Sequence, residues 1–210
     1  PCNIEKRLPK IRGCPKFNHL YLRTSGRSSK PSFHFTTWRS CHMLWLHYDY
    51  PGVPPLDFFH RLTRLPGFNA GFQVDEEDDF WQNTESLNDY RKHNKPYFHL
   101  RVNDDDRVDI TGNPGHRFEY PGMLLSSGYR MWFGNRGLEL LGKERLLAFP
   151  GAHHSEELEN GAIFIQLYEN PREYEALENR RRQQEFRDWL DLDQLESTAR
   201  HQLNRMTEAP

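Results

Sequence analysis

Apolar and polar residues alternate in several short segments of the chain, the pattern typical of β-strands. Pro, Gly, Asn and Asp bound these segments, and such residues end strands. The predicted strands cover residues 44–50, 68–74, 97–102, 107–110, 116–120, 129–133, 145–149 and 162–168. The last of them is apolar almost throughout, so we expect it near the centre of the sheet. Turn residues separate the three strands between positions 97 and 120, which predicts an antiparallel meander there.

Helical spacing of apolar residues marks further segments. The predicted helices cover residues 54–65, 86–92, 138–141, 170–190 and 192–206. Asn170 can cap the helix predicted for residues 170–190, and Pro171 fits the first position of that helix. Arg180, Arg181 and Arg182 interrupt its apolar stripe, so we expect its middle to be exposed. Together the elements predict an α+β fold: a mostly antiparallel sheet, helices packed on one face and a helical C-terminus.

The first 42 residues differ in charge from the rest of the chain. They hold nine Lys or Arg and one acidic residue, whereas residues 43–210 hold 19 basic and 29 acidic residues. The three cysteines, Cys2, Cys14 and Cys41, also lie there, in a spacing that fits neither a zinc site nor a closed set of disulfides. We expect residues 1–42 to be a basic, flexible extension and residues 43–210 to be a single domain.

Two further interpretations of residues 1–42 stay open. Clustered cations attract phosphate, so the segment is a candidate arm for binding nucleic acid. Alternatively, the natural start is Met43, where the composition changes, and the preceding residues do not belong to the protein. If part of this segment is ordered, residues 33–38 are its one plausible strand.

Aromatic residues make up 13% of the chain and apolar residues only 36%, with a mean hydropathy of −0.92. Large rings bury much area each, so we expect a core built on rings. No window of 18 uncharged apolar residues predicts a membrane span, and no apolar leader predicts an uncleaved secretory signal.

Five consecutive carboxylates are followed at once by two large aromatic residues. The run comprises Asp75, Glu76, Glu77, Asp78 and Asp79, and Phe80 and Trp81 come next. Like charges repel, so such a run is usually solvated, whereas the rings are usually buried. A stretch of both kinds suits contact with a basic partner. Solvated loops are the alternative for this run, and also for residues 104–106 and for Glu156, Glu157 and Glu159.

Adjacent histidines at His153 and His154 are the most suggestive candidate for chemistry. Paired histidines bind metal and occur in metal-dependent nucleases, but such a site needs a further ligand. Glu156, Glu157 and His201 are candidates that the spacing does not select. The alternative is a polar loop before the strand at 162. The other histidines, including His116, are expected to be ordinary surface or partly buried residues, and no Gly-x-Ser-x-Gly motif is present.

Residues 43–210 resemble the immunity proteins of bacterial toxin–immunity pairs, found beside effectors of contact-dependent and type VI secretion systems. The resemblance rests on size, acidity, aromatic content and stretches such as 131–134, 147–150 and 165–169. It implies a cytoplasmic, non-enzymatic protein that covers or distorts the active site of a cognate toxin. No functional residue of the class carries over by position.

The function we expect is therefore that of an immunity protein, with a nuclease toxin as its partner. The expected contact residues are Asp75, Glu76, Glu77, Asp78, Asp79, Trp81, Glu156, Glu157 and Glu159. We assign no catalytic residue, metal ligand or cofactor. An acidic body suits blocking a basic cleft better than binding nucleic acid. A metal-dependent hydrolase using His153 and His154 is the alternative.

Overall fold

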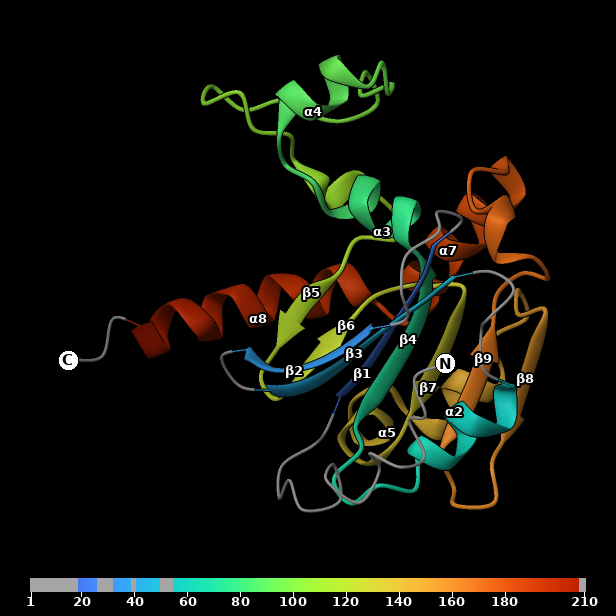
Figure 1. Ribbon diagram of the computed structural model, residues 1–210. Helices are drawn as coiled ribbons and strands as arrows, with labels where there is room; N and C mark the ends of the chain where they lie inside the picture. The colour runs from blue at the N-terminus through green and yellow to red at the C-terminus, as the bar shows by residue number, and fades with distance from the viewer. Residues whose placement is uncertain (1–18, 26–31, 39–40, 50–54, 208–210) are drawn as a thin grey trace.

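A mixed β-sheet forms the centre of the molecule (Figure 1). The computed structural model describes residues 19–25, 32–38, 41–49 and 55–207. Within them, the sheet runs in the order β2 (Ser32–Trp38), β3 (Cys41–Asp49), β1 (His19–Ser25), β4 (Ala70–Asp75), β7 (Arg130–Phe133), β9 (Ile163–Gln166) and β8 (His154–Glu157). Strand β1 is parallel to β3 and β4, and the other neighbouring pairs are antiparallel.

Helices and a second, two-stranded sheet complete the α+β fold. The described helices are α2 (Leu56–Leu62), α3 (Glu76–Asn83), α4 (Leu87–Lys92), α5 (Asn135–Leu141), α6 (Lys143–Leu147), α7 (Leu177–Trp189) and α8 (Leu192–Thr207). The 3₁₀ turns are η2 (Ile110–Gly112) and η3 (Pro171–Glu173), and the small sheet pairs β5 (Phe118–Tyr120) with β6 (Met123–Leu125). The mostly antiparallel sheet and the helical C-terminus confirm the predicted class.

Both faces of the central sheet are apolar. Alternate side chains of a strand point to opposite sides, and apolar side chains of β7 lie on each side. Met131 and Phe133 belong to the larger core, which also contains residues of α5, α6, α7 and α8. Trp132 and Phe164 belong to a second core with Phe59 and the rest of α2. Most helices therefore pack on one face, as expected, while α2 covers the other. Aromatic rings dominate the second core, with six of its nine buried residues, whereas 14 of the 22 buried residues of the larger core are not aromatic, so the expectation of a core built on rings holds only for the smaller core.

Two strands lie within the segment that we expected to be a flexible extension. That expectation is wrong for residues 19–25 and 32–38, because β1 lies between β3 and β4 and β2 pairs along β3. The residues from His19 to Leu22 include no Lys, Arg, Asp or Glu and favour a strand. The many cations of the flanking sequence made the whole segment resemble a flexible tail, so this short strand was missed. Residues 33–38 fall in β2, as the sequence suggested. Residues 1–18, 26–31 and 39–40 lie outside the described residues.

The predicted meander between positions 97 and 120 is wrong. Only isolated bridges, Ser86–Arg107 and Val102–Val108, occur there, and β5 pairs with β6 instead. Residues 101–107 are all exposed, so the apolar side chains of the alternating pattern have no core to pack against, and burial does not stabilise a strand there. Residues 143–147 form helix α6 rather than a strand, because Lys, Glu, Arg and Leu favour helices. Strand β9 lies next to the sheet edge rather than at its centre.

The long helix predicted for residues 170–190 is divided. The turn η3 is followed by a break, and α7 begins only at Leu177, which is 89% exposed. The expected exposure of its middle holds only in part: Arg181 is exposed, whereas Gln183 is fully buried and donates a hydrogen bond of 3.0 Å to the Ser127 carbonyl. Hydrogen-bonded polar residues, rather than an apolar stripe, thus attach this part of α7 to the body.

Candidate functional site

The acidic run forms the first turns of helix α3, directly after the central strand β4. Asp75 caps the helix: its carboxylate accepts hydrogen bonds from the backbone N–H of Glu77 at 2.9 Å and of Asp78 at 3.4 Å. A carboxylate at this position also interacts favourably with the helix dipole. The run is helical for this reason, and helical spacing divides it between two faces.

Three of the five carboxylates point inward, which corrects the expectation of a solvated run. Asp75, Asp78 and Asp79 are 7%, 3% and 3% exposed. Positions 75, 78 and 79 share one face of a helix, and that face of α3 packs against the body. These three residues are therefore excluded as direct contacts for a partner.

Two arginines neutralise two of the three inward carboxylates, Asp78 and Asp79. Arg117 Nη1 donates to both carboxylate oxygens of Asp79, at 2.7 and 2.9 Å, and Arg180 Nη1 lies 2.7 Å from Asp78 Oδ1. Burial raises the pKa of Asp78 to about 6, against the opposing effect of Arg180, and burial also raises the pKa of Asp75. Buried charges require such partners, so the two ion pairs fix α3 to the rest of the fold.

The outer face of α3 keeps the features expected of a contact surface. Glu77 is exposed, Glu76 is half-buried and Phe80 is 46% exposed. The Phe80 ring lies 4.9 Å from the half-buried Trp81 ring in an edge-to-face arrangement, and Trp81 Nε1 donates to Glu77 Oε1 at 3.4 Å. We call Glu76, Glu77, Phe80 and Trp81 the α3 face. It retains two of the five predicted carboxylates and Trp81, and it adds Phe80, whose ring we expected to be buried.

Lys95 ties the α3 face to its surroundings. Its Nζ lies 3.4 Å from Glu77 Oε1, 2.8 Å from Glu175 Oε1 and 5.4 Å from the centre of the Trp81 ring. Burial alone would raise the pKa of Glu77, but Lys95 and hydrogen bonds lower it below its ordinary value. Glu77 is thus a stable anion at neutral pH.

Residues 84–112, which follow α3, form a projecting lobe with a small core of its own (Figure 1). Leu87, Tyr90, Leu100 and Val108 are its buried members, with Trp81 packed against them. Tyr90 Oη donates to the Trp81 carbonyl at 2.9 Å. Beyond the lobe, Asn113 donates to the Gln82 carbonyl at 3.2 Å. The lobe is therefore attached through the end of α3.

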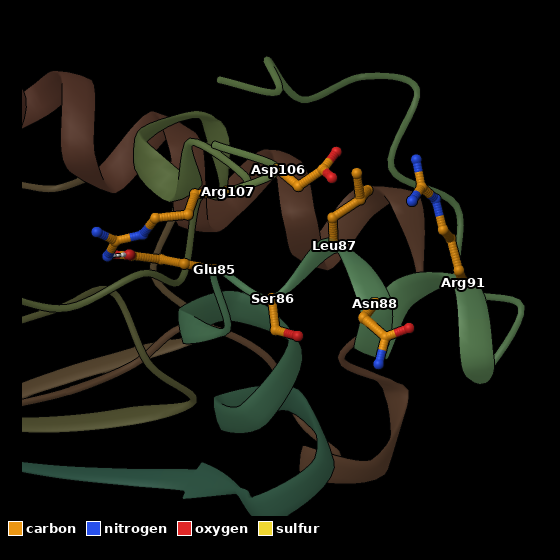
Figure 2. Close-up of a pocket in the computed structure, with 7 residues that line it drawn as sticks. All are labelled: Glu85, Ser86, Leu87, Asn88, Arg91, Asp106 and Arg107. Carbon is orange, nitrogen blue, oxygen red and sulfur yellow. Dashed lines mark ion pairs between the residues drawn. The ribbon is translucent and has the colours of Figure 1, made fainter. Parts of the chain in front are cut away.

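A pocket of about 500 Å³ opens on the lobe between α4 and residues 106–107 (Figure 2). It is lined by Glu85, Ser86, Leu87, Asn88, Arg91, Asp106 and Arg107. Glu85 and Arg107 form an ion pair with each other, and Ser86 Oγ caps α4 by accepting from the Asp89 N–H at 3.3 Å. Arg91 and Asp106 are exposed at its rim. No sequence motif marks this pocket, because its residues are separated along the chain and polar.

The second group of predicted contact residues lies at the opposite edge of the sheet from β2. Strand β8 holds Glu156 and Glu157, with β7 and β9 between it and β4. Glu157 lies 2.6 Å from Lys143 Nζ, and Glu159 lies 2.5 Å from Arg64 Nη2. The structure therefore does not join these acids to the α3 face into one patch, and their charges are largely neutralised by neighbours.

The adjacent histidines do not share a closed cluster of ligands. His153 and His154 are both exposed, and His154 Nε2 lies 3.4 Å from Glu156 Oε1. Among residues 55–202, whose side chains the structure describes, and the described part of β3, no group of three or more His, Cys, Asp or Glu is placed to hold a metal ion. The ring centres of His60 and His154 lie 5.1 and 5.9 Å from the ring centre of Phe164. Burial lowers the pKa of His60.

A buried polar network near the C-terminus was missed from the sequence. His116, expected at or near the surface, is fully buried, and its Nε2 lies 2.7 Å from Glu196 Oε2. Arg187 Nη2 lies 3.0 Å from the same nitrogen and 2.6 Å from Asp193 Oδ1. The network joins α7 and α8 to the segment before β5. We assign it a structural role, because each charge has a partner within the fold.

Comparison with protein-family models, with curated proteins and with solved structures finds no match for this chain. Among its described helices, none combines the length and the apolar character that crossing a membrane requires. The functional argument therefore rests on the geometry of the α3 face and the lobe.

Proposed function

We propose that this protein is an immunity protein, which binds and neutralises a cognate bacterial toxin in the cytoplasm. The α3 face is the proposed contact surface, with Phe80 as the apolar anchor and Glu76 and Glu77 as the anionic contacts. A nuclease is the proposed toxin class, because enzymes that act on nucleic acid carry basic clefts. An anionic surface complements such a cleft and accelerates association with it.

The observation that carries this proposal is the way in which α3 is held. Its inward carboxylates Asp78 and Asp79 are fixed by Arg180 and Arg117, while Phe80 is left 46% exposed on the outer side. A rigid surface loses little conformational freedom on binding, so more of the contact energy appears as affinity. Exposed aromatic residues beside charged ones are frequent anchors of protein interfaces.

Glu156, Glu157 and Glu159 contribute less to the proposed interface. Glu157 and Glu159 form exposed ion pairs with Lys143 and Arg64, and such pairs are weak. Glu156 lies 3.4 Å from the exposed His154 ring. These acids lie on or just beyond the edge strand β8, which β7 and β9 separate from β4. We therefore assign them at most a long-range electrostatic effect on association.

Co-expression tests the proposal. The protein encoded next to this chain's gene is expressed in a bacterial host with and without the chain, and growth is followed. We expect growth arrest that the wild-type chain relieves and that the variant Phe80→Ser relieves poorly. Leu177→Ser is the matched control, because Leu177 is an exposed apolar residue on a different helix, α7. Equal protection by both variants would exclude Phe80 as the anchor, and a harmless neighbouring protein would remove the proposed function.

A further inference from the structure

The pocket on the lobe has one cationic and one anionic side chain at its rim. Figure 2 shows Arg91 and Asp106 on either side of Leu87, with both charged groups directed to the same side. Within the described part of the chain, neither side chain forms an ion pair or a hydrogen bond. Glu85 and Arg107, in the same pocket, are paired with each other. The rim is thus a dipolar surface whose two charges are both available.

A surface of this kind is complementary to itself. When two copies meet about a two-fold axis, residue i of one copy contacts residue j of the other, and the reverse contact also forms. Arg91 of each copy would then face Asp106 of the other. A foreign partner would have to supply both charges in the same arrangement, whereas a second copy supplies them by symmetry.

Two other properties of the lobe favour association with a second copy. Phe98 is 89% exposed, and burying such a ring against a second copy is favourable. Residues 84–112 hold six acidic and five basic residues, so two lobes carry little net charge and repel each other weakly. Phe98 supplies apolar area, and Arg91 and Asp106 supply orientation.

We propose that the lobe mediates a two-fold dimer of this chain, held by reciprocal Arg91–Asp106 ion pairs and by burial of Phe98. The proposal does not depend on the proposed function, because the α3 face lies outside residues 84–112. A dimer would carry two copies of the α3 face and could engage two partner molecules.

Charge swapping tests the dimer without any partner. The full chain and its variants are measured by size-exclusion chromatography with light scattering over a series of concentrations. We expect the wild-type mass to rise from 25.1 kDa towards twice that value as the concentration increases. Arg91→Asp and Asp106→Arg each place like charges opposite each other, so each variant alone should be monomeric. An equal mixture of the two should dimerise, because each contact then joins an Asp to an Arg.

Further variants separate this mechanism from general effects. The double variant Arg91→Asp with Asp106→Arg should dimerise again, and Phe98→Ser should raise the dimer dissociation constant at least about 10-fold. Arg101→Asp and Asp104→Arg are matched controls, because both residues are exposed on the lobe but do not line the pocket. Circular dichroism verifies that every variant is folded. A wild-type chain that stays monomeric at all concentrations overturns the proposal, as does a mixture of the two single variants that stays monomeric.

Discussion

Arg180 on α7 lies 2.7 Å from Asp78 on α3, so a helix near the C-terminus neutralises a carboxylate that directly follows the central strand. Asp79, the next residue, is paired with Arg117. The acidic run is therefore a structural element on its inner side and a surface only on its outer side. The two ion pairs hold the inner side of α3 against the body, and the predictions below follow from this division.

Removing Arg117 should destabilise the fold strongly. Arg117→Ala leaves the buried carboxylate of Asp79 without its bidentate partner, and breaking such a pair typically costs about 3–5 kcal/mol. The free energy of unfolding, measured by urea denaturation, should fall by about that amount. Arg181→Ala is the control: Arg181 forms only exposed ion pairs on α7, so its loss should change stability by less than about 1 kcal/mol. Equal effects of the two changes would contradict the burial of Asp79.

Asp78 should make the fold more stable in mild acid than at neutral pH. Its pKa is about 6 in the folded chain against an ordinary value of 3.8, so between these values the folded chain keeps a proton that the unfolded chain has lost. The stability that comes from protonated Asp78 is therefore fully present below pH 4. It is lost as the pH rises through 6, and the free energy of unfolding then falls by on the order of 2–3 kcal/mol.

Comparison with Asp78→Asn isolates this titration. The free energy of unfolding of the wild type, relative to that of Asp78→Asn, should decrease from pH 4 to pH 7. Urea denaturation at each pH measures both values. Groups with shifted pKa values that do not interact with Asp78, such as Glu196, are present in both proteins and cancel in the difference. A difference that stays constant, or that favours the wild type as the pH rises, would refute the raised pKa.

The lobe should open independently of the main sheet. Leu87 is 2% exposed in a core of only a few residues, so Leu87→Ala removes a large part of that core, at a cost of about 2–5 kcal/mol. Hydrogen exchange followed by mass spectrometry should show faster exchange across residues 84–112, while β7 and β9 stay protected. If β7 and β9 lose protection to the same extent, the lobe is not a separate folding unit.

Much of the fold could be predicted from local patterns. The strands at β3, β4, β7 and β9 and the helices α2, α4 and α8 follow from alternation, helical spacing and the turn residues at their ends. The errors occurred where the outcome depends on distant contacts. The strands β1 and β2 depend on the neighbours that they pair with, and the hairpin expected within residues 97–110 is reduced to the single bridge Val102–Val108. Helix α6 was missed although its own residues favour a helix.

The candidate site was predictable only in part. The acidic run and Trp81 were expected to contact a partner, and of the five carboxylates only Glu77 and the half-buried Glu76 lie on the outer side. Phe80, whose ring we expected to be buried, is exposed there as well. The inward orientation of Asp78 and Asp79 depends on Arg180 and Arg117, and composition cannot reveal that such distant residues meet. A run of like charges in a sequence predicts mutual repulsion and exposure to solvent. Helical spacing places some of these charges on the inner face, where arginines from distant parts of the chain neutralise them. Arg91 and Asp106 likewise have no sequence signal, because only the folded lobe brings them to one pocket.

The most direct test of the central claim is the affinity of the purified chain for the toxin encoded beside it, measured by titration calorimetry at several salt concentrations. If the α3 face is the interface, Phe80→Ser should raise the dissociation constant at least about 10-fold, since anchor residues contribute most of the binding energy. Glu76→Lys with Glu77→Lys should also weaken binding, most strongly at low salt. Leu177→Ser should leave the affinity unchanged. Wild-type affinity for the Phe80 variant and for the double charge reversal would contradict the account.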